Sequence, residues 1–371
     1  MKITIKKNLL LNNLNKVTRA ISGKAFDPAL SSVKLSLDNT GLTLLGYNGD
    51  IAIKAFIKKN DDMMIEEEGN ALITAKYFQE IVSKTPSESI SIEVLDDYKI
   101  LISAGKSIFN LNGISVKEYP DVNLETKDKK IEVPGSEFKE AIKQIAFATS
   151  LEEDRPVITG INIKITGNIM QLCATDSYRL ARRYIKLDNN IKDTVNVTLP
   201  KTNAQELLNL IADNDEKIKF SFFDNRLIAE YANFVFETRL INGSYPEVSN
   251  LFPTDFILDI NIDVNKLYKA IEMVSILIKD EEHSVVALEI KDNKMSFTLD
   301  SQEVGRAYQE IELDKKYDDF KITFSSKFML ESLASFKSEK ILLQFVSNSK
   351  PIVLSDIENN NLSHLVLPRR S

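Results

Sequence analysis

Three eight-residue stretches decide the fold: LLNNLNKV at residues 10–17, FKEAIKQI at 138–145 and LYKAIEMV at 267–274. In each stretch the first, fifth and eighth residues are apolar, and this spacing places them on one face of an amphipathic helix. The stretches begin 128 and then 129 residues apart, and each follows a short alternating strand. A repeat this long indicates three copies of a whole domain, because solenoid repeats run at about 20–50 residues.

A second predicted helix keeps nearly the same period, at residues 75–84, 202–212 and 326–336. Short strand-like runs lie between the helices, and Asn, Asp and Gly turns separate them. Each copy is therefore expected to be an α+β domain in which two helices pack on antiparallel sheets. The expected domain boundaries are 1–126, 127–252 and 253–371.

The composition is that of an ordinary globular protein, with 43% apolar and 27% charged residues among 371. A single cysteine, Cys173, has no internal disulfide partner, and two histidines are too few for a standard zinc site. The N-terminus has no signal-peptide core, and no apolar run approaches the roughly 18 residues of a membrane span. We therefore expect a cytoplasmic protein that makes no membrane contact.

The placement of charge matters more than its total. The chain carries −7 overall. The segments 7–22, 75–86, 135–150, 201–213, 263–279 and 325–337, which contain the six predicted helices, together carry +5, so the rest carries −12. Helices on one surface would contact phosphates without reading bases, whereas the alternative is that their cations only solvate outward faces. The candidate DNA-facing residues are Lys16, Arg19, Lys24, Lys76, Lys139, Lys143, Lys201, Lys266, Lys269 and Lys327.

Motifs that carry catalytic chemistry are missing or incomplete. The Gly-Lys-Ser at 105–107 lacks the first glycine of a phosphate-binding loop. Acidic pairs at 61–62, 96–97, 152–153 and 281–282 stand in turn-like, polar settings that are typical of solvated loops. Neither His283 nor His364 has an obvious catalytic partner in the sequence. No catalytic residue, metal site or cofactor is therefore predicted.

The stretch ATDSYRLA at 174–181 resembles A-T-D-[SG]-[HY]-R-L-A, a signature of the bacterial sliding clamps, the beta subunits of DNA polymerase III. The segments FATS at 147–150, RPVITG at 155–160, NGSYP at 242–246 and LVLPRR at 365–370 agree with the same family in order and spacing. The resemblance covers the whole chain, including three domains of the expected size.

The resemblance implies a non-catalytic processivity factor: a head-to-tail homodimer that closes as a ring around double-stranded DNA, with no cofactor. It implies as partners the polymerase catalytic subunit, the clamp-loader complex, and repair and ligation proteins that carry clamp-binding peptides. It places Lys24 at a basic DNA contact. It places the dimer interface at Phe109, Leu111, Ile276 and Leu277, for which core packing is the alternative.

The resemblance also implies a pocket between the second and third domains that accepts a short extended peptide. Leu180, Leu251 and Leu367 would help to form its apolar floor. Arg179 would offer a polar contact at the rim, with a salt bridge to Asp176 as the alternative. The implied pocket residues are Arg155, Val157, Ile158, Thr175, Ser177, Tyr178, Arg179, Leu180, Pro246, Leu251, Phe328, Ser349, Pro351, Leu365, Leu367, Pro368 and Arg370.

Three positions depart from the family pattern. Asn250 stands where related clamps often carry Arg, and Phe328 lacks the hydroxyl of a Tyr found in some relatives. Arg369 stands where an aliphatic residue or Met is usual, and its charge is expected to weaken the second apolar subsite or shift its peptide preference.

Two other functions are compatible with the sequence. One is a clamp-like interaction protein that does not encircle DNA, which the modest +5 on the helices suggests. The other is an enzyme that acts on nucleic acid, which needs a cluster of acidic or histidine side chains that the sequence does not supply.

Overall fold

The computed structural model describes residues 1–371 except 22–26, 249, 279–284, 359–360 and 370–371. The chain divides into two compact units. The first contains Met1–Ser136 and Gln205–Leu240, and the second contains Glu137–Ala204 and Ile241–Ser371.

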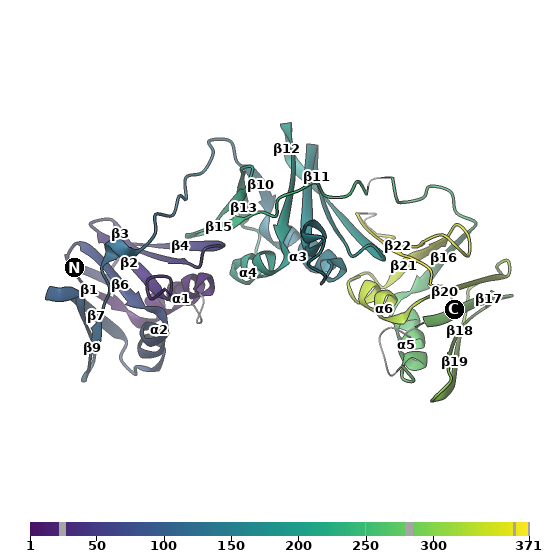
Figure 1. Ribbon diagram of the computed structural model, residues 1–371, viewed down its shortest axis with the longest axis horizontal. Helices are drawn as coiled ribbons and strands as arrows, with labels where there is room; N and C mark the ends of the chain where they lie inside the picture. The colour runs from purple at the N-terminus through teal and green to yellow at the C-terminus, as the bar shows by residue number, and fades with distance from the viewer. Residues whose placement is uncertain (22–26, 249, 279–284, 359–360, 370–371) are drawn as a thin grey trace. The chain divides into compact units, whose positions relative to one another are not determined.

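The first unit contains two antiparallel sheets. The smaller has the strand order β5 (Met63–Glu67), β1 (Lys2–Lys6), β7 (Ser89–Val94), β8 (Lys99–Ala104) and β9 (Ser107–Asn112). The larger has the order β10 (Ile131–Pro134), β13 (Lys217–Phe222), β14 (Arg226–Tyr231), β15 (Phe234–Arg239), β4 (Ile51–Lys58), β3 (Gly41–Tyr47), β2 (Ser32–Asp38) and β6 (Gly69–Thr74). Helices α1 (Lys7–Val17) and α2 (Ala75–Lys84) lie side by side in this unit (Figure 1).

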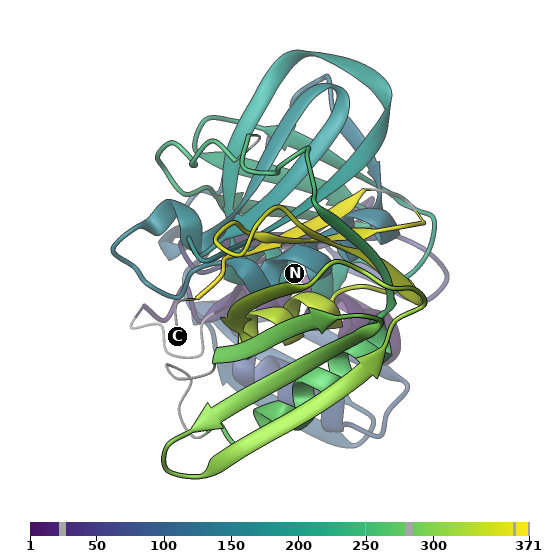
Figure 2. The same cartoon turned by 90° about the vertical axis from the view of Figure 1, so that its right-hand side faces the viewer.

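The second unit also contains two antiparallel sheets. The larger has the order β11 (Gly160–Thr175), β12 (Arg179–Pro200), β23 (Leu362–Val366), β22 (Ile352–Asp356), β21 (Lys340–Phe345) and β16 (Leu258–Asp263). The smaller has the order β19 (Gly305–Glu312), β18 (Lys294–Ser301), β17 (Val285–Lys291) and β20 (Phe320–Ser325). Helix α5 (Val264–Ser275) packs on the smaller sheet and against α6 (Ser326–Ala334) (Figure 2).

Every α-helix in the described residues begins directly after a strand. Helix α3 (Gly135–Ile145) follows β10, and α4 (Lys201–Leu210) follows β12 in the same way. The apolar residues that set the sequence repeat point into the core, since Leu10, Phe138 and Leu267 are each at most 1% exposed. The predicted helical faces are therefore confirmed.

Two predicted helix ends are wrong by two residues. Helix α4 ends at Leu210 and α6 ends at Ala334, although the predicted helices continue to 212 and 336. Ile211 and Phe336 remain buried after the helices have ended. Apolar spacing therefore continued the predicted helices into segments that are buried but not helical.

Candidate functional site

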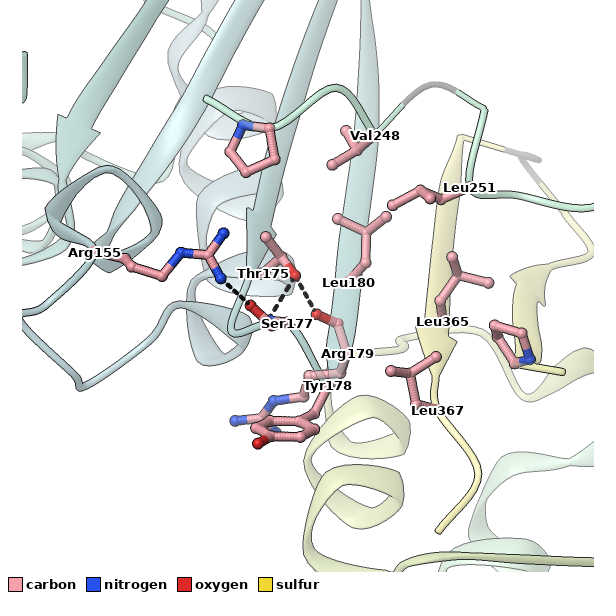
Figure 3. A pocket seen from close by; sticks show the side chains of 12 residues that line it. Arg155, Thr175, Ser177, Tyr178, Arg179, Leu180, Val248, Leu251, Leu365 and Leu367 are labelled. Carbon is pink, nitrogen blue, oxygen red and sulfur yellow. Dashed lines mark hydrogen bonds between the residues drawn. The ribbon is translucent and has the colours of Figure 1, made fainter. Parts of the chain in front are cut away.

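A cavity of about 300 Å³ opens in the second unit, where β12 begins and β23 ends (Figure 3). The pairing of these strands sets Leu180 opposite Leu365 and Arg179 opposite Val366. The loop that contains Pro246 and Leu251 closes another side. The lining residues are Arg155, Thr175, Ser177, Tyr178, Arg179, Leu180, Pro246, Val248, Leu251, Pro351, Leu365 and Leu367.

The floor of the cavity is apolar and firmly held. Leu180 and Leu365 are each 4% exposed, and they belong to one buried cluster with Ile158, Cys173 and Val248. Two other lining leucines are less buried, since Leu251 and Leu367 remain 55% and 37% exposed. These exposed groups leave apolar surface for a ligand to cover, and covering one leucine-sized side chain contributes about 1.5–3 kcal/mol.

A tight turn at residues 175–179 shapes the rim. The Thr175 hydroxyl donates to the Arg179 carbonyl over 2.6 Å and accepts the Ser177 backbone N–H over 3.1 Å. One Asp176 carboxylate oxygen accepts the backbone N–H groups of Tyr178 and Arg179. Ser177 has a φ of +77°, a conformation that favours glycine. The turn leaves the Tyr178 side chain 53% exposed at the pocket.

The guanidinium of Arg179 is locked inside the protein. Its Nε donates to Asp176 over 2.9 Å, and its terminal nitrogens donate to Glu331 and to the Phe147 carbonyl. The Phe147 and Phe328 rings lie 5.1 and 4.5 Å from its Cζ. The alternative of a salt bridge with Asp176 is therefore confirmed. Arg179 is also one of the residues that line the cavity, and its expected polar contact at the rim stays a prediction.

Arg155 is the exposed arginine of the pocket. Its Nη1 donates to the Ser177 hydroxyl over 3.3 Å, and in Figure 3 its side chain extends toward that turn. Val157 and Ile158 were also predicted to line the pocket, but neither is a lining residue. Ile158 belongs to the buried cluster, and the side chain of Val157 packs against that cluster.

Four other predicted pocket residues are not among those that line the cavity. Phe328 is not a lining residue, but its ring stacks on Tyr178 with centroids 6.3 Å apart. Ser349 and Pro368 also lie outside the lining, and Arg370 is outside the described residues. Val248, which lies between the predicted Pro246 and Leu251 in the chain, also lines the cavity and was missed.

The predicted DNA-facing residues have unequal environments. The Lys16 ammonium donates to Asn233 over 2.9 Å, and burial lowers its pKa. Arg19 forms an ion pair with Glu206 at 3.1 Å. Burial and the nearby Arg179 charge lower the pKa of Lys201. Lys139 and Lys327 are partly buried and have internal contacts, and Lys24 is outside the described residues. The predicted DNA-facing residues with exposed side chains are Lys76, Lys143, Lys266 and Lys269.

The predicted interface residues lie at element edges. Phe109 and Leu111 are half-buried on β9, which is an edge strand of the five-stranded sheet. Ile276 is 68% exposed directly after α5, and Leu277 is half-buried beside it.

The titratable side chains outside the pocket offer no candidate metal site in the described residues. Over the described ranges, no three His, Cys, Asp or Glu side chains group closely enough to hold a metal ion. His364 is fully buried, and burial lowers its pKa to about 3. Glu281, Glu282 and His283 are outside the described residues. Within the same described part of the chain, no helix is long and apolar enough to cross a membrane.

The fold and the pocket define a binding scaffold of repeated α+β domains, and comparison with known proteins identifies its family. Models of the N-terminal, central and C-terminal domains of the DNA polymerase III beta subunit match residues 1–125, 132–247 and 249–370. The chain is 31% identical over 377 residues to the beta sliding clamp of Bacillus subtilis (strain 168), with 100% of both proteins covered. It therefore belongs to the DNA polymerase III beta subunit family, the bacterial sliding clamps.

Solved structures agree with this assignment. The DNA polymerase sliding clamp from Bacillus subtilis has a TM-score of 0.95 at 31% identity, with 100% of this chain and 99% of that chain covered. The beta subunit from DNA polymerase of Streptococcus pyogenes has a TM-score of 0.95 at 30% identity, with 100% of both chains covered. Three tandem clamp domains are thus confirmed, while the boundaries at 126 and 252 stay predictions.

Proposed function

We propose that this sliding clamp works as a mobile tether without catalytic activity. Two copies would close head to tail around duplex DNA, and each would hold a replication or repair protein in its pocket. The pocket at the junction of β12 and β23 carries the proposal, because an apolar floor and a pinned turn suit a short peptide. The proposed partners are the polymerase catalytic subunit, the clamp loader, and repair and ligation proteins. The cytoplasmic location stays a prediction.

The pocket is suited to capture a peptide by its apolar side chains. Leu180 and Leu365 supply a floor that is already packed, so a ligand does not need to order it. Leu251 and Leu367 supply apolar area that is exposed in the single chain. A few anchors in such a pocket carry most of the binding energy of an interface.

Ring closure is proposed to use an edge strand from each copy. Among the described strands, β9 pairs only with β8, and β19 pairs only with β18. Both edges therefore present backbone donors and acceptors to a second chain. The exposed Ile276 and the half-buried Phe109 add apolar area that a contact between copies would cover. Head-to-tail contacts of this kind give a closed ring when the rotation closes.

Contact with DNA is proposed to be weak and independent of sequence. Exposed lysines such as Lys76, Lys143 and Lys266 are suited to phosphates, and phosphate contacts carry no sequence information. Retention would then depend on ring closure more than on affinity, because phosphate contacts weaken steeply with salt.

The mass in solution tests the dimer. Light scattering at micromolar concentration is expected to give twice the 42.0 kDa of one chain. Ile276→Asp is expected to give the single-chain mass, because a charge would replace an exposed apolar contact of the interface. Ile257→Asp is the matched control, since Ile257 is 62% exposed outside the proposed interface. A wild-type monomer, or an Ile276→Asp dimer as stable as the control, contradicts the proposal.

A clamp-like protein that does not encircle DNA is the second candidate. The observation in its favour is that Lys16 and Arg19 are already engaged by Asn233 and Glu206. This function predicts that the protein leaves circular DNA as fast as linear DNA. Loading on both forms of DNA therefore separates the two candidates.

A further inference from the structure

The C-terminal tail fixes a charged side chain beside the pocket. The Leu367 backbone N–H donates to the Tyr178 carbonyl over 2.9 Å, in line with the six-stranded sheet. Two residues later the Arg369 N–H donates to the Thr323 carbonyl of β20 over 2.9 Å, and the Thr323 hydroxyl donates back to the Arg369 carbonyl. The backbone of Arg369 is therefore held by hydrogen bonds within the second unit.

Two aromatic rings position the Arg369 guanidinium. Its Cζ lies 5.5 Å from the Tyr178 ring centroid and 5.8 Å from that of Phe328. These two rings stack on each other, and Tyr178 also lines the pocket. A guanidinium over aromatic faces keeps its planar donors available for a carboxylate. The Arg369 charge therefore lies at the edge of the pocket, next to the exposed Tyr178.

Nearby carboxylates are committed elsewhere. Asp176 and Glu331 both bind the guanidinium of Arg179, and Asp176 also accepts two backbone N–H groups. Among the described residues, Arg369 has no carboxylate within ion-pair distance. The Arg155 side of the mouth differs, because the acidic run 152–154 directly precedes that arginine. Between these two arginines, and within the described part of the chain, the Arg369 side is the one where a fixed cation has no acidic run directly before it.

We propose that Arg369 makes the pocket select partner peptides that carry an acidic side chain two residues from their apolar anchor. This inference rests on the proposed function of the pocket. Successive residues of an extended chain advance about 3.3 Å, and alternate side chains share a face. A peptide whose anchor lies against Leu367 therefore brings a side chain two positions away toward Arg369.

The peptide charge is the variable of the test. Short fluorescein-labelled peptides with blocked ends would carry two central leucines in a Ser/Gln background. Two positions would vary together: the second residue before the first leucine and the second residue after the second leucine. Both would be Asp, both Asn or both Lys. Fluorescence anisotropy with wild type is expected to give affinity in the order Asp, Asn, Lys, with steps of up to about five-fold. The steps are expected to shrink as salt increases.

Variants distinguish the inference from the proposed function. Arg369→Leu is expected to remove the charge order while the Asn peptide still binds, and Arg369→Lys is expected to retain part of the order. Leu367→Asp is expected to weaken binding of every peptide roughly 100-fold. Binding that requires Leu367 but has no charge order in wild type, or an order that persists in Arg369→Leu, overturns the inference alone. Absence of binding by all peptides, or binding that ignores Leu367→Asp, overturns the pocket's function and the inference with it.

Discussion

The pocket and the basic helix residues are two candidate binding surfaces built in opposite ways. The pocket depends on short-range contacts in one place: the turn at 175–179 bonds to itself, and Arg179 is fixed between two aromatic rings. The basic residues are spread over the helices, and Lys16 and Arg19 already have internal partners. One substitution is therefore expected to destroy the pocket, whereas no single lysine should decide DNA retention.

The largest expected effect follows the loss of the buried cation. Arg179→Met leaves Asp176 and Glu331 without their shared partner, and breaking a buried ion pair costs about 3–5 kcal/mol. Scanning calorimetry is expected to show a midpoint about 10 °C lower in the affected transition. Arg155→Met, at an exposed arginine of the same pocket, is the control and is expected to change little. Equal midpoints for both variants would contradict a structural role for Arg179.

The second prediction separates partner binding from DNA retention. Leu367→Asp places a charge against the apolar wall and is expected to weaken binding of a leucine-containing peptide roughly 100-fold, or about 2.7 kcal/mol. Ile357→Asp is the control, since Ile357 is 43% exposed and does not line the pocket. Fluorescence anisotropy measures the affinity for the peptide. Retention on circular DNA is expected to be unchanged in both variants. Loss of DNA retention with Leu367→Asp would show that the two surfaces are not independent.

The third prediction concerns His364, which lies behind the pocket between the Phe147 and Phe336 rings. Burial first and the Arg179 charge second lower its pKa from the usual 6.5 to about 3. Between about pH 6.5 and pH 3 the imidazole is protonated in the unfolded state but neutral in the folded state. The free energy of unfolding therefore falls as the pH falls through this range.

Between pH 7 and pH 5 this contribution is about 2 kcal/mol, since each pH unit below the unfolded pKa costs up to about 1.4 kcal/mol. Urea unfolding of wild type and His364→Gln at both values measures it. The variant is expected to lose less stability on acidification than wild type. Identical losses would mean that His364 is not held neutral.

The smallest effect is expected on the helices. Lys266→Gln removes an exposed cation, and the slope of log affinity for linear duplex against log salt should fall by about 0.9 if Lys266 contacts one phosphate. Lys16→Gln is expected to change the slope less, because Lys16 is half-buried and bonded to Asn233. Equal changes would show that this internal contact does not withhold Lys16 from DNA.

The same contrast explains what was predictable from sequence. Helix faces were predictable, because the spacing of Leu10, Leu14 and Val17 persists over two turns and reports burial directly. The ends of α4 and α6 were not, because buried residues follow both helices. The turn residues of the pocket were inferred from the family signature alone, and the hydrogen bonds within the turn are what the structure adds.

Other features of the site depend on contacts between distant residues. Arg179 contacts Phe147, Phe328 and Glu331, which lie far from it in the chain, so the sequence indicated only its pairing with the nearby Asp176. The Arg19 ion pair with Glu206 also joins residues 187 positions apart. Periodicity and local motifs do not contain such pairings, because they report only residues that are near in sequence.

Retention on closed and cut DNA tests the central claim that the protein encircles its duplex. The protein would be loaded by a clamp-loader complex on nicked circular DNA, moved to high salt, and then exposed to an enzyme that cuts the circle. If the protein encircles DNA, it remains on the intact circle at high salt and is released once the circle is cut. Release from the intact circle as fast as from the cut DNA would contradict encirclement.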